Sequence, residues 1–373
     1  MTHVTVVQPY LARYRVPFFE RLAADLALRG IDLTVAHGRP TGALAARGDS
    51  CRLPGSVQLA QRVFHIGGRE LLWRRIGDLA RGADVLILEQ ALRNLESYPW
   101  LACRGGPAVA LFGHGRTYTR RAGPLARAAK SALTRRADWF FAYTEQGARH
   151  VAREGFPADR ITVVDNAIDT TALAAAVDAV TEEELAAFRR RHALEPGRTA
   201  LYLGGLDGPK RIPFLLAAAA HAAERLPGFR LLVAGDGEER ARVRAAQAAG
   251  RCVVYLGPLS GRAKALAGAA SDVLMLPGLV GLAAVDSFAL RCPLVASPDA
   301  DHAPEFGYLE HGRNALIVPG GARAYGEAVA GLLTRPALLE TLRRACRSDA
   351  ARYTVEGMSA RSVEGIERLL AAR

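Results

Sequence analysis

Short apolar strands alternate with longer helical stretches along the whole chain, and this alternation is the feature that most constrains the fold. Runs of this kind are typical of parallel sheets covered by helices on both faces. In the first half we expect strands at 4–7, 32–36, 85–88, 108–112, 139–143 and 161–164, with a helix near 16–29. The pattern restarts with strands at 200–203, 230–234, 252–256, 273–276 and 294–296. The sequence therefore predicts an α/β protein built from two doubly wound, Rossmann-like units.

A length of 373 residues suits two domains better than one. The join falls at 168–199, where a polar helix is expected at 181–192 with a capping box opened by Thr181. We predict an N-terminal domain at 1–170, a C-terminal domain at 171–350, and a helix at 351–373 that packs back toward the N-terminal domain. Ligands of open parallel sheets bind at the carboxyl ends of the strands, so the site is expected in a cleft between the domains.

Basic residues are unevenly distributed by type and by place. Of the 49 basic residues only three are lysines, Lys130, Lys210 and Lys264, and residues 1–165 hold 24 basic against 14 acidic side chains. Segment 116–136 carries seven basic residues and no acidic one, which fits either a solvated helix face or contact with a membrane surface. Nucleic acid is not an expected partner, because no basic motif interleaved with aromatic residues occurs.

The five cysteines are scattered and form no CxxC pair, which argues against a zinc site or a disulfide framework. The strand at 4–7 is not preceded by the basic segment and long apolar core of a signal peptide. No apolar run reaches the ~18 residues that are needed to span a bilayer. We therefore expect a cytoplasmic protein, with peripheral contact at the inner face of the cell membrane through the basic N-terminal half.

A glycine-rich turn follows the expected strand at 200–203 and leads to a helix that Lys210 opens. Gly204 and Gly205 allow the backbone to approach a ligand closely. A helix N-terminus beside an ammonium group is suited to a diphosphate. The rarity of lysine makes Lys210 informative, although strand–glycine–helix turns occur in any α/β fold.

A second turn, Gly235-Asp236-Gly237, follows the expected strand at 230–234. Such a turn can pass beside the base or ribose of a nucleotide, and it can equally be an ordinary tight turn. The sequence alone leaves both interpretations open.

A third segment starts at the strand at 273–276, where a loop leads to a helix beginning near Gly281. Asp286 lies near the first turn of that helix, where its carboxylate can accept two hydrogen bonds from a ribose diol. The free N–H groups of Gly281 and Leu282 are suited to a phosphate. Alternatively, Asp286 only complements the helix dipole.

Taken together and in order, these segments resemble the retaining GT-B glycosyltransferases of family four. The resemblance covers nearly the whole chain, and no single motif in it is decisive. The matching positions are 14–22, Phe112-Gly113-His114-Gly115, 164–169, Lys210, Gly235-Asp236-Gly237, Asp286, Pro304-Glu305 and Asn314.

The resemblance implies a GT-B fold, a nucleoside-diphosphate sugar as donor, and transfer to an acceptor hydroxyl with retention of configuration. It implies no metal or other cofactor, so Asp299-Ala300-Asp301 is not expected to bind a metal. Lys210 would stabilise the leaving diphosphate. His114 would hydrogen-bond the transferred sugar or, alternatively, fill a structural place between the domains.

Two positions depart from the family pattern. Gly278 stands where the family has a glutamate that holds sugar hydroxyls, and Gly205 stands where it has an arginine that neutralises the diphosphate. The first departure implies altered donor-sugar contacts. For the second, we hypothesise that Arg211 or Arg15 supplies the missing charge.

The N-terminal half is expected to bind the acceptor, a saccharide, a lipid-linked or a small-molecule alcohol, through Arg15, Glu89 and His114. Two other functions stay open. One is a nucleotide-sugar epimerase, for which no additional acid and base can be placed. The other is a non-catalytic partner that binds a nucleotide sugar, favoured by Gly278 and Gly205.

Overall fold

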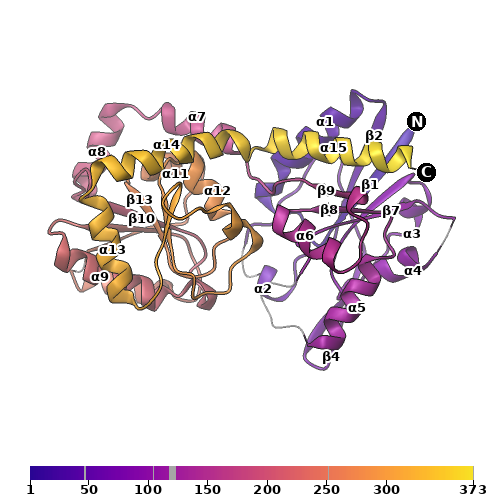
Figure 1. Cartoon of the computed structure of the whole chain (residues 1–373), viewed down its shortest axis with the longest axis horizontal. Coiled ribbons are helices and arrows are strands. Elements are labelled where there is room, and N and C mark those ends of the chain that lie inside the picture. Colours follow the sequence, from indigo (N-terminus) through magenta and orange to yellow (C-terminus); the bar gives the residue numbers. More distant parts are fainter. Residues whose placement is uncertain (46–47, 104, 117–122, 251, 373) are drawn as a thin grey trace. The chain divides into compact units, whose positions relative to one another are not determined.

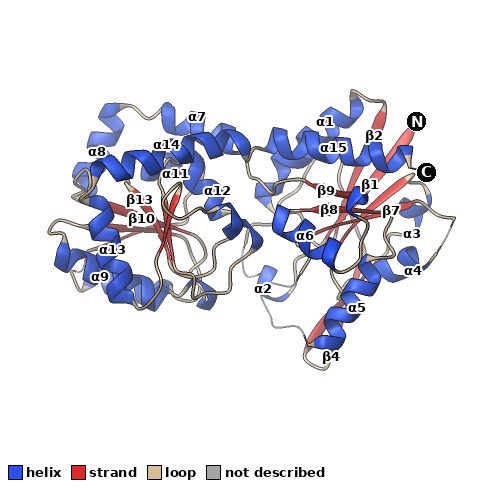
Figure 2. Ribbon diagram, viewed as in Figure 1, coloured by secondary structure: helices blue, strands red, loops and turns tan. Residues whose placement is uncertain are grey.

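The computed structural model describes residues 1–45, 48–103, 105–116, 123–250 and 252–372. The chain divides into two compact units. Unit 1 comprises Met1–Ile168 together with Val355–Arg373, and unit 2 comprises Asp169–Thr354. In each unit helices cover a parallel sheet, so the predicted α/β architecture of two Rossmann-like sheets is confirmed (Figures 1 and 2).

Unit 1 contains a seven-stranded parallel sheet in the order β3-β2-β1-β6-β7-β8-β9. Its strands are β1 (Thr2–Gln8), β2 (Ile31–His37), β3 (Val57–Gln58), β6 (Val85–Glu89), β7 (Ala108–Gly113), β8 (Trp139–Ala142) and β9 (Ile161–Val163). Every strand expected in this half is present, and the short β3 was not expected. The direction of winding reverses between β1 and β6, which is the topological switch point of the sheet.

Strand β6 shows why this sheet is buried on both faces. Successive side chains of a strand point to opposite faces. Val85 and Ile87 therefore pack against α1 (Val16–Ala27) and α15 (Val355–Ala371), whereas Leu86 and Leu88 join a second cluster on the other face. Fully burying an aliphatic side chain contributes about 1.5–3 kcal/mol, so both clusters hold the strand in place.

The C-terminal helix α15 belongs to unit 1, where it lies along α1 (Figure 1). The hydroxyl of Ser359 donates to Oδ2 of Asp25 over 2.7 Å, and Arg361 donates to the carbonyl oxygen of Val164. These bonds and the buried side chains of α15 make it an integral part of this core.

An antiparallel hairpin that the sequence did not predict is inserted between β3 and β6. It consists of β4 (Gln61–Ile66) and β5 (Arg69–Arg74), joined by Gly67-Gly68 with φ of 57° and 71°. Two positive φ values are the signature of a tight type I′ turn, which glycine accepts without strain. The strand β5 is anchored by the buried ion pair of Arg74 with Glu96, 2.5 Å apart.

The remaining helices of unit 1 cover its sheet and its loops. They are η1 (Arg13–Arg15), α2 (Gly42–Ala45), α3 (Gly77–Arg81), α4 (Ser97–Ala102), α5 (Pro124–Thr134), α6 (Glu145–Arg153) and η2 (Ala158–Arg160).

Unit 2 contains a six-stranded parallel sheet in the order β12-β11-β10-β13-β14-β15, the strand order of a dinucleotide-binding fold. Its strands are β10 (Thr199–Leu203), β11 (Arg230–Ala234), β12 (Val253–Gly257), β13 (Val273–Leu276), β14 (Leu294–Ala296) and β15 (Ala315–Ile317). Only β15 was not expected. The switch point lies between β10 and β13.

The helices of unit 2 are α7 (Thr170–Asp178), α8 (Glu182–His192), η3 (Gly208–Lys210), α9 (Ile212–Arg225), α10 (Arg240–Ala248), α11 (Gly261–Ala269), α12 (Ala283–Ala289), η4 (Pro304–Tyr308), α13 (Ala322–Leu333) and α14 (Pro336–Arg352). The capping box predicted for α8 is confirmed. Thr181 Oγ1 accepts from the Glu184 N–H, and the Glu184 carboxylate accepts from the Thr181 N–H.

Candidate active site

The two loops at the switch point of unit 2 are tied together by Lys210. Gly204 and Gly205 follow β10, and residues 277–282 follow β13, so both loops leave the carboxyl edge of the sheet. The ammonium of Lys210 donates to the carbonyl oxygen of Leu279 over 2.7 Å, and the Leu279 N–H donates to Pro209. A positive charge therefore lies where open α/β sheets bind their ligands.

The presence of glycine instead of the family's glutamate at position 278 has a steric reason. A Cβ atom at this position would lie 2.4 Å from the backbone carbon of Lys210 and 2.5 Å from the Pro209 carbonyl oxygen. Both neighbours are backbone, so neither can turn aside. A glutamate at 278 is therefore incompatible with this loop, and the family's sugar-binding carboxylate cannot be placed here without moving it.

Backbone packing also explains the glycines of the second turn. A Cβ on Gly235 would lie 1.8 Å from the carbonyl oxygen of Gly204, and one on Gly237 would lie 2.5 Å from that of Leu206. The turn after β11 thus packs directly on the turn after β10. This contact accounts for both glycines, and their approach to a nucleotide stays a prediction.

Arg211 lies next to the same loops. Its backbone is left-handed, with φ of 55°, and its guanidinium lies 4.3 Å from the ring centre of Phe214. Its Nη1 atom is 3.4 Å from the carbonyl oxygens of both Pro277 and Asp299. Arg211 therefore adds a second positive charge beside Lys210 at the switch point.

The third predicted segment forms α12, which begins at Ala283, just after Gly281 and Leu282. Asp286 lies in its first turn as expected, but it has a partner that the sequence did not reveal. Oδ1 of Asp286 is 2.5 Å from Nζ of Lys264 on α11, and both side chains are largely buried. The carboxylate is thus held in a fixed orientation.

His302 holds the loop of residues 277–282, which follows β13, in place through Val280. Its Nδ1 accepts the N–H of Val280 over 3.1 Å, and its Nε2 lies 2.8 Å from the carbonyl oxygen of Ser297. This pattern requires the neutral ring with the proton on Nε2. Burial, the largest cause, lowers the pKa of His302, which favours the same neutral form.

In unit 1, His114 follows β7 and packs against Tyr143, with the ring centres 4.5 Å apart. The guanidinium of Arg15 lies 5.1 Å from the same Tyr143 ring, and Arg15 is 7% exposed. Burial, followed by the charges of Arg15 and Lys130, lowers the pKa of His114 to about 3. The imidazole is therefore neutral near pH 7 and serves as a hydrogen-bonding group.

Glu89 ends β6, which lies next to β7 in the sheet of unit 1 and borders its switch point. Its Oε2 accepts from the amide of Asn94 over 2.9 Å, and Arg93 lies 3.9 Å from Oε1. Burial lowers the pKa of Lys130 on α5 to about 8, while the charge of Glu89 acts in the opposite direction. Glu89, Lys130 and His114 therefore interact electrostatically within unit 1.

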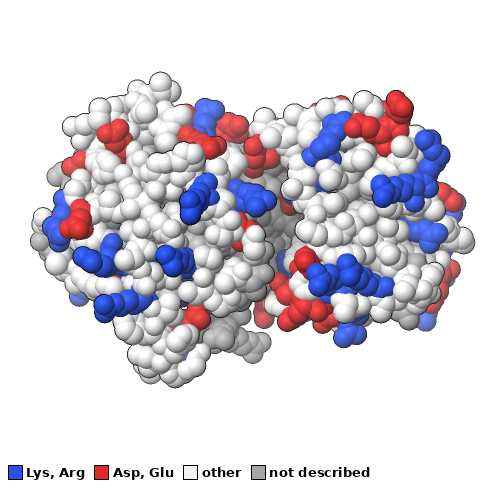
Figure 3. Space-filling model, turned by 180° about the vertical axis from the view of Figure 1, so that it is seen from behind, with Lys and Arg blue, Asp and Glu red and all other residues white. Residues whose placement is uncertain are grey.

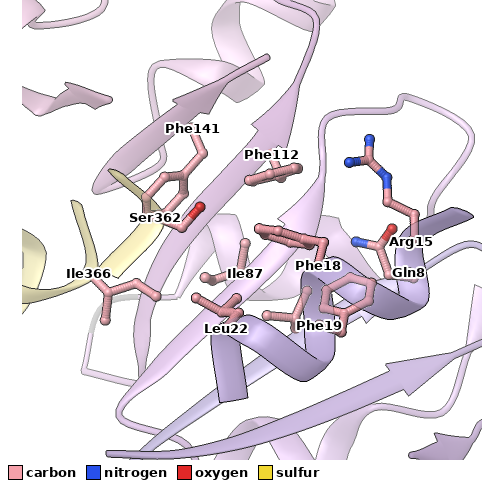
Figure 4. Close-up of a pocket in the computed structure, with 11 residues that line it drawn as sticks. Gln8, Arg15, Phe18, Phe19, Leu22, Ile87, Phe112, Phe141, Ser362 and Ile366 are labelled. Carbon is pink, nitrogen blue, oxygen red and sulfur yellow. The ribbon is translucent and has the colours of Figure 1, made fainter. Parts of the chain in front are cut away.

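A pocket lies below Arg15 in unit 1, and Figure 4 shows Arg15 and Gln8 at one end of it. The rest is lined by apolar side chains of the core, among them Phe18, Phe112 and Phe141. Its volume of about 10 Å³ holds no more than one water molecule. It is a gap in packing and no sugar site.

Sequence reasoning missed four residues that interact with the predicted site residues or their loops. They are Lys264, Lys130, Tyr143 and His302. The first two carried a usable signal, because every lysine in this arginine-rich chain is rare. Tyr143 and His302 carried none, because their roles depend on contacts that only the folded backbone creates.

Among the described residues no cluster of three or more histidine, cysteine or acidic side chains is arranged to hold a metal ion. Within the same residues, no helix is both long and apolar enough to cross a bilayer.

Figure 3 shows basic side chains as separate groups on the face drawn, with acidic groups among them. Of the basic segment 116–136, Arg120 and Arg121 lie outside the described residues.

Two family models match the chain, one in each half. Residues 17–172 match "Glycosyltransferase Family 4", and residues 197–335 match "Glycosyl transferases group 1". No match to a curated protein sequence was found.

Solved structures with the same fold cover nearly the whole chain. A glycosyltransferase from Rickettsia africae is 13% identical, with a TM-score of 0.71, and the alignment covers 99% of this chain and 98% of that one. Anabaena HepE in complex with UDP is 14% identical, with a TM-score of 0.66 and 99% and 100% covered. Sucrose-phosphate synthase from Thermosynechococcus elongatus is 17% identical, with a TM-score of 0.69 and both chains fully covered.

Proposed function

Because this chain belongs to the GT-B glycosyltransferases of family four, we propose that it transfers a sugar from a nucleoside-diphosphate sugar to an acceptor hydroxyl with retention of configuration. The observation that carries the proposal is the position of Lys210 at the switch point of unit 2, bonded to the loop after β13. Retention follows from the family resemblance, as does a role in cell-surface polysaccharide, glycolipid or natural-product biosynthesis.

The donor would bind at unit 2. Lys210 and Arg211 would supply two positive charges for the diphosphate. They follow a turn whose glycines, Gly204 and Gly205, allow a ligand to approach the backbone closely. Gly281 and Leu282 precede α12 and would present N–H groups to the same phosphates. Asp286, held by Lys264, would accept the ribose hydroxyls.

The chemical step would be driven by electrostatic stabilisation of the leaving group. Lys210 and Arg211 stabilise the negative charge that develops on the departing diphosphate as the glycosidic bond breaks. The acceptor oxygen then bonds to the anomeric carbon on the same face, and its proton passes to the diphosphate. The proposal includes no metal or other cofactor, because these two side chains supply the positive charge.

His114 would act as a neutral hydrogen-bonding group beside the transferred sugar. Its low pKa keeps the imidazole uncharged near pH 7, so it can form hydrogen bonds but does not act as a general acid. Glu89 and Arg15 would complete the acceptor side in unit 1. A saccharide, a lipid-linked or a small-molecule alcohol fits this chemistry, and the basic N-terminal half supports a cytoplasmic enzyme at the inner face of the membrane.

The experiment has two stages. Thermal unfolding in the presence of UDP-, GDP- and dTDP-sugars identifies the donor, since only a bound ligand raises the melting temperature. Turnover with that donor and a panel of acceptor alcohols should then release nucleoside diphosphate only when an acceptor is present. NMR of the product should show the anomeric configuration of the donor, and an inverted product would refute the proposed stereochemistry.

A side chain is sterically excluded at Gly278, so the family's sugar-binding glutamate is missing there. This absence favours a second candidate function, that of a non-catalytic partner that binds nucleotide sugars. It predicts a raised melting temperature with a nucleotide sugar and no turnover with any acceptor. An epimerase would instead convert the donor without an acceptor, so the same assay distinguishes all three functions.

A further inference from the structure

One face of the β4–β5 hairpin is apolar and basic at the same time. Residues directly opposite each other in an antiparallel pair share a face, and residues two apart along a strand return to it. The register pairs Arg62 with Trp73, Phe64 with Leu71 and Ile66 with Arg69, so these six side chains lie on one face of the hairpin.

Three of the four apolar side chains of this face are exposed, and the fourth, Leu71, is partly buried. Phe64 is 42% exposed, Ile66 is 62% exposed and Trp73 is 40% exposed, and they lie within one two-stranded ribbon. Scattered apolar residues on a surface need no explanation, but a contiguous group marks an interaction site. In the view of Figure 2, β4 of the hairpin lies at the lower edge of unit 1, below the main sheet.

The charges of the face identify the occupant. Arg62 and Arg69 stand at its two ends, and neither strand contributes an acidic side chain to it. The one carboxylate of the hairpin, Glu70, lies on the opposite face, where it accepts from Thr41. A second copy of the chain would bring the arginines of both copies into one interface with no carboxylate between them.

An anionic lipid surface satisfies every group of this face. Tryptophan favours the headgroup level of a bilayer, and phenylalanine and isoleucine enter the acyl boundary. Arginine lays its aliphatic stem along apolar surface and keeps its guanidinium among the phosphates. We propose that the face formed by Arg62, Phe64, Ile66, Arg69, Leu71 and Trp73 docks the protein on an anionic lipid bilayer.

Vesicle sedimentation of the full chain tests this proposal without any donor or acceptor, so its outcome is independent of the transferase chemistry. The wild-type protein should bind phosphatidylcholine vesicles that contain phosphatidylglycerol. The double variant Phe64→Ser/Trp73→Ser should bind them at least about tenfold more weakly. Arg62→Gln/Arg69→Gln should lose about fivefold per charge on these vesicles and little on pure phosphatidylcholine.

Two matched controls make the result specific. Val63→Ser removes an exposed apolar residue from the opposite face of the same strand, and Leu125→Ser removes the 87% exposed leucine of α5. Both should bind like wild type, and all variants should keep the wild-type melting temperature.

Four outcomes would overturn the proposal. The wild-type protein fails to bind either vesicle; the hairpin variants bind as well as wild type; or Leu125→Ser abolishes binding instead. The fourth is a dimer in light scattering that becomes monomeric in Phe64→Ser/Trp73→Ser, which would assign the face to a second copy.

Discussion

The Nζ atom of Lys264 lies 2.5 Å from Oδ1 of Asp286, joining α11 to α12 in unit 2. The side chains are 19% and 14% exposed, so the pair is shielded from water on most sides. An ion pair in such surroundings orients its members strongly, and removing one leaves the other charge poorly solvated. Lys264 is thus a positioning residue for the carboxylate proposed to hold the ribose.

A double-mutant cycle measures this coupling. Lys264→Met and Asp286→Asn should each lower the free energy of unfolding by about 1–3 kcal/mol, because each leaves a partly buried polar group without its partner. The double variant should lose less than the sum of the two. Urea unfolding of the four proteins provides the values, and additive losses would show that the pair does not act as a unit.

The contact of Gly278 with the backbone of Lys210 makes a second prediction. Gly278→Ala should lower the free energy of unfolding by about 1–3 kcal/mol and weaken nucleoside-diphosphate binding, because the loop after β13 must move away from Lys210. Gly331→Ala is the control, since Gly331 lies inside α13 with nothing within 4 Å of an added Cβ. It should be neutral or stabilising by up to about 1 kcal/mol.

The neutral state of His114 predicts a loss of stability in acid. Its folded pKa of about 3 lies below the unfolded value of 6.5, so between these values the unfolded chain binds more protons. The free energy of unfolding should therefore fall as pH falls from 6.5 toward 3, with a contribution of at most about 1.4 kcal/mol per pH unit from this residue. Unfolding of His114→Gln across this range should show a shallower slope than wild type, and an unchanged slope would contradict the prediction.

The pKa of Lys130 should lie well below the ordinary value of a lysine. NMR of isotopically labelled lysine suits this chain, which has only three lysines. One signal, absent in Lys130→Arg, should titrate near pH 8, because burial disfavours the ammonium. Glu89→Gln should lower that pKa further, since the carboxylate favours the charged form, whereas Asp78→Asn at an exposed site should leave it unchanged. The structure would be contradicted if the signal that Lys130→Arg removes titrated near 10 in the wild-type protein.

The two Rossmann-like sheets could be predicted from the sequence because their strands are buried on both faces. Such strands appear as continuous apolar runs, as at 85–88 and 273–276, and the structure places strands there. The β4–β5 hairpin escaped prediction because its strands are half exposed, so arginine and histidine interrupt its apolar residues. The short strands β3 and β15 carry too few residues to leave a periodic pattern.

The site was predictable only in outline. The turn chemistry of Gly204, Gly205 and Lys210 is local, so it is visible in the sequence. The partner of Asp286 is not local, because Lys264 precedes it by 22 residues and meets it only when α11 and α12 pack side by side. The reason for Gly278 is likewise tertiary, since it depends on the backbone 68 residues earlier at Lys210.

Calorimetric titration with nucleoside diphosphates tests the central claim most directly, that Lys210 holds a diphosphate at the switch point of unit 2. We predict that at least one of UDP, GDP and dTDP binds the wild-type protein and that Lys210→Met weakens it at least about tenfold, a loss of about 1.4 kcal/mol or more. Lys130→Met, in unit 1, should bind it as wild type does. Equal affinity of Lys210→Met and wild type, or no binding of any of the three, would contradict the account.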